Sequence, residues 1–336
     1  MPKNKDISPS PKEEDRTLDL ALRPQKFTEY IGQENIKNNI RVIIEAAKKR
    51  KDPCIEHLLF YGGSGLGKTT LSYLVAKEMG VGIRTVAGPS IKKMGDLAAI
   101  LTNLREGDVL FIDELHRMNR VCEEIIYPAM EEFRLNLIIG KGPMARTMNL
   151  KVPRFTLVGA TTRLALLSSP LRSRFGATFR VDSYSTKEIG EIIKRSAALL
   201  NLKIEKEAIM AIASRSRFNP RVANRLLKRV RDFSEVEGNK VIKKEETEKS
   251  LSFLDVDTMG LEPGDKKILE ILLDKFDGGP AGLQSLAASA AEEEETIIEI
   301  YEPYLMQIGF LKRTPRGRIA TPAAKKYLEN QNNGRT

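Results

Sequence analysis

IEHLLFYGGSGLGKTTLSYLVAKEMG, residues 55 to 80, is the stretch of this 336-residue chain that decides its fold. An apolar run leads straight into a glycine-rich loop, and a helical pattern follows the loop. The loop matches G-x-x-x-x-G-K-[ST] through Gly62, Gly67, Lys68 and Thr69, so its backbone N–H groups and the helix N-terminus can cradle phosphates. An ordinary glycine-rich turn is the alternative, and the complete G-K-[ST] ending disfavours it.

Lys68 and Thr69 carry the chemistry of this loop. We expect the ammonium group of Lys68 to reach the β and γ phosphates of ATP, and the Thr69 hydroxyl to hold Mg²⁺. A second ligand for the metal should then lie at the end of another buried strand.

DVLFIDELHR, residues 108 to 117, supplies that ligand. Val109–Ile112 is a continuous apolar run of the kind found in parallel sheets, and Asp113 and Glu114 follow it at once. We expect Asp113 to hold Mg²⁺ through water, and Glu114 to polarise the water that attacks the γ-phosphate. Because strands commonly end in charged residues, this pair gains its weight from the phosphate loop upstream. His116 is expected to be a surface or satisfied histidine rather than a second base.

RFTLVGATT, residues 154 to 162, predicts a third strand that ends in hydroxyl groups. Ligands bind at the carboxyl ends of parallel strands, so Thr162 is a candidate sensor of the γ-phosphate. A turn stabilised by the threonine hydroxyl explains the same residues equally well.

Composition limits the class of protein. The chain is long enough for two or three domains, and its 41% hydrophobic content fits a soluble globular protein. No uncharged apolar run approaches the roughly 18 residues of a membrane span, and the N-terminus lacks the apolar core of a secretory signal, so we expect a cytoplasmic protein. Cys54, Cys122, His57 and His116 show no metal-ligand spacing, and we expect all four to be structural.

Charge is distributed unevenly along the chain. The net charge is +10, with +8 over residues 1 to 182, +5 over 183 to 256 and −3 over 257 to 336. In the last region Gln307–Lys326 holds six cations and no acid, whereas Glu292–Gly309 holds six glutamates and no cation. A segregated basic strip favours contact with a polyanion, although a basic surface often serves only solubility.

The phosphate loop, IDELH, ATTR and SRF, in this order, resemble the AAA+ ATPases, and among them most closely the RuvB family of Holliday-junction branch-migration motors. The similarity spans about residues 20 to 330. It is carried by LRPQKFTEYIGQE (22 to 34), IDELHR (112 to 117), GATTRLALLSSPLRSRFG (159 to 176), RSRFNPRVANRLLKRVRDF (215 to 233) and EPYLMQIGFLKRTPRGR (302 to 318). One departure is GGSGLGKT, where the family usually has two prolines after the first glycine.

The resemblance implies an α/β fold: an AAA+ P-loop NTPase domain with a parallel sheet, then a small helical lid and a C-terminal winged-helix domain. The expected boundaries are a flexible tail over 1 to 20, the large ATPase domain over 21 to 182, the lid over 183 to 256, the winged helix over 257 to 330 and a tail over 331 to 336. Tyr184 falls where the family contacts the nucleotide base. The full set implied for nucleotide binding is Leu22, Arg23, Gly62, Gly65, Gly67, Lys68, Thr69, Thr70, Glu131, Glu132, Phe133, Arg174, Tyr184 and Arg221.

SSPLRSRFG, residues 168 to 176, holds two arginines in a segment that otherwise suits burial. Each guanidinium therefore needs an anion or access to solvent. Ser169 is the expected N-cap and Pro170 the first residue of a short helix. Because residues two apart do not share a helical face, Arg172 and Arg174 do not serve one anion equally.

The resemblance assigns Arg174 as an arginine finger that reaches the γ-phosphate bound by the neighbouring subunit. This role implies a homo-oligomeric ring, expected to be a hexamer, since a second protomer must supply the nucleotide. Ion pairs within the chain, with acids such as Glu131 or Glu132, are the alternative.

FNPRVANRLLKRVRDF, residues 218 to 233, predicts a helix of the lid. Asn219 is typical of an N-cap and Pro220 of the first helical position. Arg221 then lies in the first turn, where a cation opposes the helix dipole by roughly a few tenths of a kcal/mol. A phosphate in front of the helix would remove this conflict, which favours a phosphate sensor over an exposed arginine without a role.

RLNLIIGKGPMARTMNL, residues 134 to 150, has two apolar-rich runs around GKGP and predicts a β-hairpin. Leu137, Ile139, Met144 and Met148 are candidates for an exposed apolar patch, which usually marks a protein contact. The resemblance implies docking to the junction-binding protein RuvA and names the junction resolvase RuvC as a further partner. Packing of the hairpin on its own domain is an equally supported alternative.

The last region predicts a winged helix, with helices over Lys266–Phe276, Leu283–Ala290 and Glu295–Ile308 and two short strands around a Pro-Arg-Gly turn. Glutamates in and before the third helix would face DNA phosphates, so that helix is a poor DNA reader. The cations of the wing are the expected phosphate contacts: Lys312, Arg313, Arg316 and Arg318. A solvated basic turn is the alternative.

Together these features predict a DNA-translocating ATPase ring that drives branch migration of four-way junctions, with phosphate contacts to DNA that are independent of sequence. The nearest alternative is a clamp-loader-type AAA+ switch, in which RPQKFTEYIGQE and SRF occur in similar form. The winged helix and the lack of a zinc-binding cysteine cluster argue against it. A second alternative is a DNA-binding regulator in which nucleotide only gates assembly.

Overall fold

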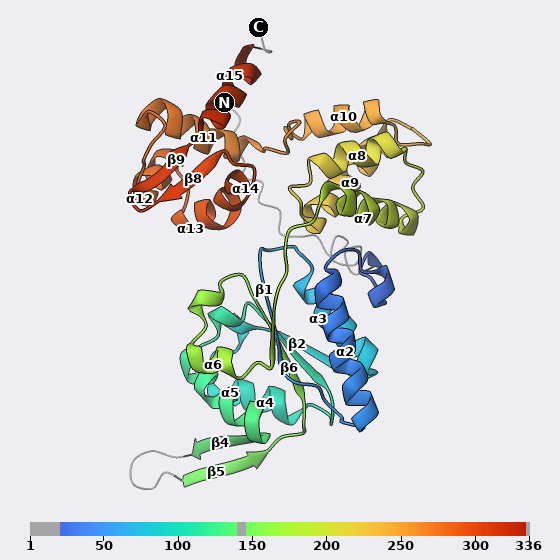
Figure 1. Ribbon diagram of the computed structural model, residues 1–336, viewed down its shortest axis with the longest axis vertical. Coiled ribbons are helices and arrows are strands. Elements are labelled where there is room, and N and C mark those ends of the chain that lie inside the picture. The colour runs from blue at the N-terminus through green and yellow to red at the C-terminus, as the bar shows by residue number, and fades with distance from the viewer. Residues whose placement is uncertain (1–20, 140–145, 334–336) are drawn as a thin grey trace. The chain divides into compact units, whose positions relative to one another are not determined.

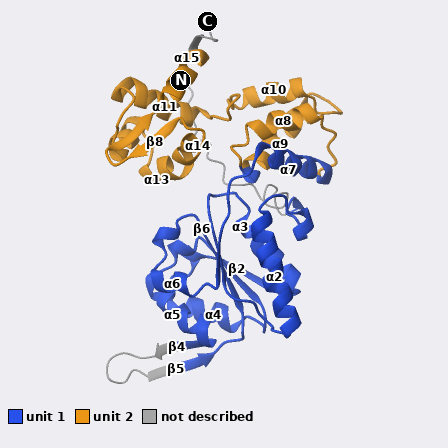
Figure 2. Ribbon diagram, in the orientation of Figure 1, with its two compact units in different colours: residues 1–199, 219–221 blue, residues 200–218, 222–336 orange. Residues whose placement is uncertain are grey.

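The computed structural model describes residues 21 to 139 and 146 to 333 (Figure 1). The chain divides into two compact units, which Figure 2 colours separately. The first comprises the chain up to Leu199 together with Asn219–Arg221, and the second comprises Leu200–Phe218 and the chain from Val222 on. The predicted N-terminal tail lies outside the described residues. Among the described helices, none is long and apolar enough to cross a membrane.

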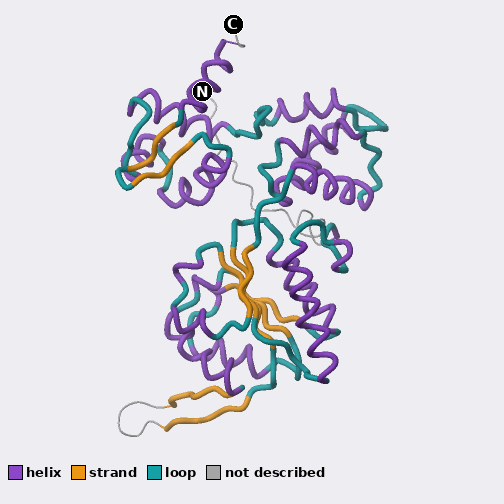
Figure 3. The backbone as a smooth tube through the Cα atoms, viewed as in Figure 1, coloured by secondary structure: helices purple, strands orange, loops and turns teal. Residues whose placement is uncertain are grey.

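A five-stranded parallel sheet forms the centre of the first unit (Figure 3). Its strand order is β2-β3-β6-β1-β7, and every neighbouring pair is parallel. Strands β1, β3 and β6 are apolar without alternation because the sheet is buried on both faces. The strands are β1 (Leu58–Tyr61), β2 (Ile83–Ala87), β3 (Val109–Asp113), β6 (Thr156–Thr161) and β7 (Ala177–Arg180). The predicted α/β fold with a parallel sheet is confirmed.

Helices cover both faces of this sheet, with α2 and α3 on one side and α4, α5 and α6 on the other (Figure 1). The second group packs a cluster of buried side chains against Leu110, Ile112 and Leu157 of the strands. The helices are α2 (Glu34–Arg50), α3 (Lys68–Met79), α4 (Met94–Thr102), α5 (Arg120–Glu132), α6 (Ser169–Ser173) and α7 (Thr186–Leu199), with 3-10 turns η1 (Phe27–Glu29), η2 (Gly88–Ser90), η3 (Leu115–Arg117) and η5 (Leu164–Leu166).

Strands β4 (Arg134–Ile139) and β5 (Arg146–Lys151) pair antiparallel between α5 and β6, which confirms the predicted hairpin. Leu135 is buried in the cluster beside α5, so the base of the hairpin packs on its own domain. Met148 is 44% exposed farther along β5. Met144 lies outside the described residues.

Helices and a two-stranded wing make up the second unit. The winged-helix core is a cluster that runs from Leu261 to Leu328. The elements are α8 (Lys206–Ser214), α9 (Pro220–Val236), α10 (Lys244–Phe253), α11 (Pro263–Phe276), α12 (Leu283–Ala290), α13 (Glu294–Thr296), η6 (Ile297–Tyr301), α14 (Glu302–Gln307), β8 (Leu311–Thr314), β9 (Gly317–Ala320) and α15 (Pro322–Asn333). The last helix continues past residue 330, where the sequence predicts a tail.

The third helix of the winged helix runs without a break from Glu294 to Gln307, which confirms the predicted helix, although its middle turn is not α-helical. Its middle section η6 is a π-helical turn, and α14 follows it directly. Pro303 lies in the first turn of α14 and has no N–H to donate to the preceding turn, so the regular bonding pattern fails there.

Ser168, rather than the predicted Ser169, caps α6. The Ser168 hydroxyl accepts a hydrogen bond from the Leu171 N–H at 3.1 Å, and Pro170 takes the second helical position. Pro170 is tolerated there because the first N–H groups of a helix have no partner within the helix. The same hydroxyl also donates to Glu123 of α5.

His57 is buried beside β1 and is structural, as expected. Its Nδ1 accepts from the Leu157 N–H at 2.9 Å, and its Nε2 lies 3.0 Å from the carbonyl oxygen of Met130. These partners fit the neutral ring, with the proton on Nε2. Burial lowers the pKa of His57, and the hydrogen bond to Met130 opposes this shift only in part.

The free energy of unfolding should therefore fall as the pH drops below about 6.5, because the unfolded chain binds a proton there that folded His57 does not bind. Replacing His57 with Asn should cost about 1–2 kcal/mol at pH 7.5 through lost hydrogen bonds, yet flatten the decline between pH 7 and pH 5. Urea unfolding of both proteins at several pH values measures the two effects. Equal slopes for wild type and variant would contradict this account.

Candidate nucleotide site

The phosphate loop connects β1 to α3 at the carboxyl edge of the sheet. Positive φ angles of 144°, 79° and 99° at Gly62, Gly65 and Gly67 let the backbone turn tightly enough to place its N–H groups around one point. A Cβ at Gly62 would meet the Val181 carbonyl oxygen at 2.3 Å, so only glycine fits there. Thr70 follows in the first turn of α3.

Lys68 begins α3 and its ammonium group lies against the loop. It donates to the carbonyl oxygens of Gly62 at 2.8 Å and Gly63 at 2.7 Å. Burial lowers the pKa of Lys68 to about 8, Asp113 opposes the shift, and Arg221 adds to it. Lys68 is therefore still largely protonated at neutral pH, and phosphate oxygens would favour its charged form.

Thr69 and Asp113, the two predicted metal ligands, come together from α3 and β3. The Thr69 hydroxyl donates to Asp113 Oδ2 at 3.4 Å. Hydroxyl and carboxylate oxygens suit Mg²⁺, which usually takes one or two protein ligands and fills its shell with water and substrate phosphates. Among the described residues, no group of three or more His, Cys, Asp or Glu could hold a metal. This donor set therefore fits Mg²⁺ that arrives with a nucleotide.

Glu114 directly follows Asp113 in a left-handed conformation, with φ of 49°. A non-glycine residue there costs roughly 1–2 kcal/mol. Its N–H donates to Asp113 Oδ1 at 2.9 Å, and its exposed carboxylate pairs with Arg117 at 3.2 Å. The strain and the exposed carboxylate beside Asp113 fit the role predicted for Glu114.

Strand β6 ends at Thr161, and Thr162 follows it as an exposed residue. The buried Thr161 hydroxyl lies 3.0 Å from His116 Nδ1 and accepts from the Arg163 N–H at 3.0 Å. His116 is thus satisfied, as expected, and ties β6 to the turn after Glu114. The sequence analysis missed Thr161, since two adjacent threonines after an apolar run give no signal of which one turns inward.

The segment before α2 contributes Leu22 and Arg23. Leu22 is buried, and its carbonyl oxygen accepts from Arg195 at 2.8 Å. The guanidinium of Arg23 lies over the ring of Tyr73 on α3, 5.1 Å from its centroid. Arg23 is therefore held against α3, the helix that follows the phosphate loop, whereas Leu22 is held by Arg195 of α7.

Tyr184 is brought against the phosphate loop. Its hydroxyl donates to the Leu66 carbonyl oxygen at 3.1 Å and lies 2.9 Å from the Tyr30 hydroxyl. Burial raises the pKa of Tyr184 to about 12, so it remains a neutral hydrogen-bonding group. Tyr30, which the sequence analysis did not single out, contacts the same loop, because its hydroxyl lies 3.4 Å from the Leu66 carbonyl oxygen.

Asn219 and Arg221 also reach the loop. Asn219 Oδ1 accepts from the Arg221 N–H at 2.9 Å, which confirms the predicted cap, and Asn219 Nδ2 donates to the Ser64 carbonyl oxygen at 2.8 Å. Arg221 donates to the Ser64 hydroxyl at 3.2 Å. Ser64 occupies one of the positions where the family usually has proline, and a proline could not accept this bond.

Arg174 is held by contacts within its own chain. Its Nη1 donates to the Pro170 carbonyl oxygen at 2.8 Å, its Nε lies 3.3 Å from Glu131, and its guanidinium lies 4.3 Å from the ring centroid of Tyr127. The ion pair with Glu131 is the alternative raised from the sequence. Because the Glu131 side chain is 56% exposed, the pair is worth only about 0–1 kcal/mol.

Arg174 lies at the opposite edge of the sheet from its own phosphate loop. The Gly176 N–H, two residues on, donates to the His57 carbonyl oxygen, which precedes β1, whereas the loop follows β1. Strand β1 pairs in parallel with β7 from its first residue and is roughly 10 Å long. Arg174 therefore cannot easily serve the nucleotide of its own chain.

Glu131, Glu132 and Phe133 end α5 at the same edge as Arg174. Glu131 pairs with Arg174, Glu132 is exposed, and the Phe133 ring packs edge-on against Phe155, just before β6. Any nucleotide contact by these residues would therefore involve another subunit.

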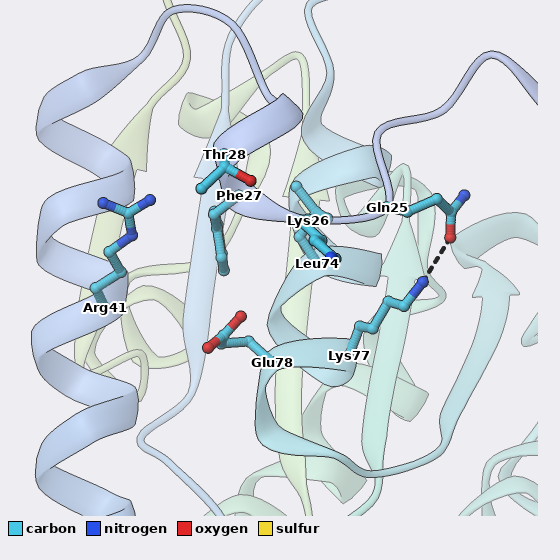
Figure 4. Close-up of a pocket in the computed structure, with 8 residues that line it drawn as sticks. All are labelled: Gln25, Lys26, Phe27, Thr28, Arg41, Leu74, Lys77 and Glu78. Carbon is cyan, nitrogen blue, oxygen red and sulfur yellow. Dashed lines mark hydrogen bonds between the residues drawn. The ribbon is translucent and has the colours of Figure 1, made fainter. Parts of the chain in front are cut away.

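A pocket of about 410 Å³ lies between η1, α2 and α3 (Figure 4). Its lining is Gln25, Lys26, Phe27, Thr28, Arg41, Leu74, Lys77 and Glu78. Since none of the predicted site residues lines this pocket, it is separate from the nucleotide site.

Comparison with known proteins decides the family. The P-loop domain model of the Holliday junction DNA helicase RuvB matches residues 22–181, the RuvB AAA lid model matches 184–257, and the RuvB C-terminal winged helix model matches 258–329. The chain belongs to the RuvB family.

Individual relatives cover nearly the whole chain. The Holliday junction branch migration complex subunit RuvB of Dehalococcoides mccartyi (strain CBDB1) is 52% identical over 315 residues, which are 94% of this chain and 90% of that protein. The solved Thermotoga maritima RuvB Holliday junction branch migration motor is 48% identical with a TM-score of 0.84, covering 92% of this chain and 98% of that one. RuvB membership disfavours the clamp-loader alternative.

Within the RuvB winged helix of this chain, the wing corrects one expectation. Lys312, Arg313 and Arg316 are exposed, but Arg318 is 9% exposed and pairs with Glu302 on α14 at 2.5 Å. Arg318 is engaged in this buried ion pair, so it is not a surface cation that can contact DNA phosphates. The sequence could not reveal the pair because α14, β8 and the wing turn separate Glu302 from Arg318.

The lowered pKa of Lys68 predicts that ATP binding depends on pH. Bound phosphates favour protonated Lys68, so ATP affinity should fall as the pH rises through about 8, approaching tenfold per pH unit above it. In Lys68→Arg the cation stays charged at every pH tested. Its ATP affinity should be weaker at pH 7.5 but should not change with pH up to pH 9.5. Titration with a fluorescent ATP analogue checks both. A flat wild-type profile would show that Lys68 does not control the affinity.

Proposed function

We propose that this chain is an ATP-driven motor that branch-migrates four-way DNA junctions in homologous recombination and DNA repair. One arrangement carries the proposal: a complete phosphate loop with Asp113 and Glu114 at one edge of the sheet, Arg174 at the other, and a winged helix in the same chain. The branch-migration role named for the relatives supports it.

ATP hydrolysis follows from the groups around the loop. The loop N–H groups and Lys68 bind the β and γ phosphates, and Thr69 and Asp113 would hold Mg²⁺. When bound, the metal neutralises charge on the phosphate oxygens. Glu114 orients and polarises the attacking water, while Thr162 and Arg221 would contact the γ-phosphate from β6 and the lid helix.

Arg174 would complete the site of the neighbouring subunit. The finger and the loop of one chain face opposite edges of the sheet, so a head-to-tail ring, expected to be a hexamer, brings them together. Glu131, Glu132 and Phe133 would then border the same neighbouring nucleotide. This geometry favours hydrolysis between subunits.

DNA and protein partners would use other surfaces. Exposed Lys312, Arg313 and Arg316 suit phosphate contacts that carry no sequence information, as a motor that travels along DNA requires. The hairpin of β4 and β5, with exposed Met148, is the proposed docking element for RuvA, and RuvC is a further proposed partner. All of these partners agree with a cytoplasmic location.

The decisive experiment is ATP-dependent dissociation of a synthetic four-way junction, with and without RuvA. We expect dissociation that RuvA stimulates and that Lys68→Ala abolishes, since the variant cannot bind the phosphates. Glu114→Gln should bind ATP and stall. Robust ATP hydrolysis with an intact junction would overturn the motor, and full function of Glu114→Gln would favour a regulator in which nucleotide only gates assembly.

DNA binding by the wing makes a separate prediction. Replacing Arg313 with Ala should lower the slope of log affinity against log salt by roughly one, with no change in sequence preference, because one phosphate contact is lost. Lys275→Ala, which removes an exposed cation of α11 outside the wing, is the matched control. Fluorescence anisotropy over a salt series measures the slopes. An equal decrease of the slope in both variants would contradict a specific role of the wing in DNA binding.

A further inference from the structure

One face of α5 packs against the start of α6, the short helix that Arg174 directly follows (Figure 1). Glu123 and Tyr127 lie one helical turn apart on this face. The Tyr127 hydroxyl donates to Glu123 at 2.9 Å and lies 3.0 Å from the Ser168 hydroxyl, which also donates to Glu123. Because Ser168 caps α6, these bonds fix the Tyr127 ring to the first turn of that helix.

Glu123 makes this arrangement unusual. Glu123 is only 8% exposed, and its carboxylate accepts hydrogen bonds from the hydroxyl groups of both Tyr127 and Ser168. Burying a carboxylate is costly unless it is hydrogen-bonded, and packing alone would be served as well by an apolar residue. The polar cluster instead fixes the direction of its two hydroxyl-bearing side chains.

The guanidinium of Arg174 rests on the Tyr127 ring, with 4.3 Å between its carbon and the ring centroid. This is a favourable cation–π distance for a planar group that stacks well on aromatic faces. Arg174 is 22% exposed, whereas its counter-ion Glu131 is 56% exposed. A phosphate that arrives from solvent can therefore replace Glu131 without moving Arg174 off the ring.

We propose that Tyr127 is a positioning residue for Arg174, a role that rests on the proposed action of Arg174 on the neighbouring subunit's nucleotide. The ring supports one face of the guanidinium, and the bonds to Glu123 and Ser168 hold the ring in place. Glu131 is the exchangeable counter-ion that the neighbouring γ-phosphate replaces. A long arginine side chain held in this way loses little freedom when it engages the phosphate.

The first measurement is steady-state ATP hydrolysis by the full chain on DNA. Tyr127→Leu removes the ring face, and kcat should fall roughly 3- to 10-fold, with KM for ATP unchanged because Tyr127 does not contact the subunit's own nucleotide. Tyr127→Phe keeps the ring but loses the hydroxyl that bonds to Glu123 and Ser168, so we expect kcat to fall about 2-fold. Val121→Ala, at an exposed position of the same helix, is the matched control and should behave as wild type.

Subunit mixing separates positioning from a general structural fault. Lys68→Ala subunits have a dead phosphate loop but an intact Arg174. In mixed rings they can complete the loop of a Tyr127→Leu subunit, so hydrolysis per competent loop should rise toward the wild-type value. In an Arg174→Ala background, Tyr127→Leu should cause no further loss, because both changes remove one function.

Three outcomes would overturn the proposal: an unchanged kcat in Tyr127→Leu, a loss that Lys68→Ala subunits do not restore, or a further loss in the Arg174→Ala background. Full activity of Arg174→Ala alone would instead overturn the proposed action of Arg174 on the neighbouring nucleotide. Failure of that proposal is therefore distinguishable from failure of the positioning role of Tyr127. If circular dichroism shows that the Leu variant does not fold, Tyr127→Phe, with nearly the same volume, carries the same comparisons.

Discussion

The direction of the parallel strands is the constraint on which this molecule depends. The carboxyl edge of the sheet gathers the phosphate loop, Asp113 and Glu114, because parallel strands deliver their next residues to one side. Arg174 lies at the amino edge, since it precedes β7, whose first residue pairs with the first residue of β1. In the proposed function, a second copy of the chain is therefore what brings Arg174 to the phosphate loop.

Exposure separates the permanent charge pairs of this chain from the exchangeable ones. Arg318 and Glu302 are 9% and 3% exposed, and removing either partner would leave a buried charge, so the pair is structural. Arg174 and Glu131 are more exposed, at 22% and 56%, and water screens their attraction. The Arg174–Glu131 pair, at 3.3 Å against 2.5 Å for Arg318–Glu302, is therefore the weaker of the two, as the role proposed for Arg174 requires.

Sequence alone was sufficient where local chemistry decides the structure. The phosphate loop, the apolar run before Asp113 and the Asn219 cap were predicted because glycine, strand periodicity and capping act over a few residues. Ser168 was missed because the adjacent Ser169 fits the local capping pattern as well. Arg318 was assigned wrongly and Thr161 was missed because their partners lie far away in the chain: Glu302 buries the arginine, and His116 selects the threonine. Periodicity contains no information about such partners.

The phosphate loop shows how a local rule can be replaced by a tertiary one. A proline after the first glycine would restrict the unfolded loop and so favour its folded form. Ser64 gives up that advantage, but its carbonyl oxygen accepts from Asn219 and its hydroxyl from Arg221. The loop is therefore held partly by Asn219 and Arg221, at the start of α9. In the proposed function, a γ-phosphate that draws Arg221 away from Ser64 would remove one of the contacts that hold the loop, and sensing and loop order would be coupled through the Ser64 hydroxyl group.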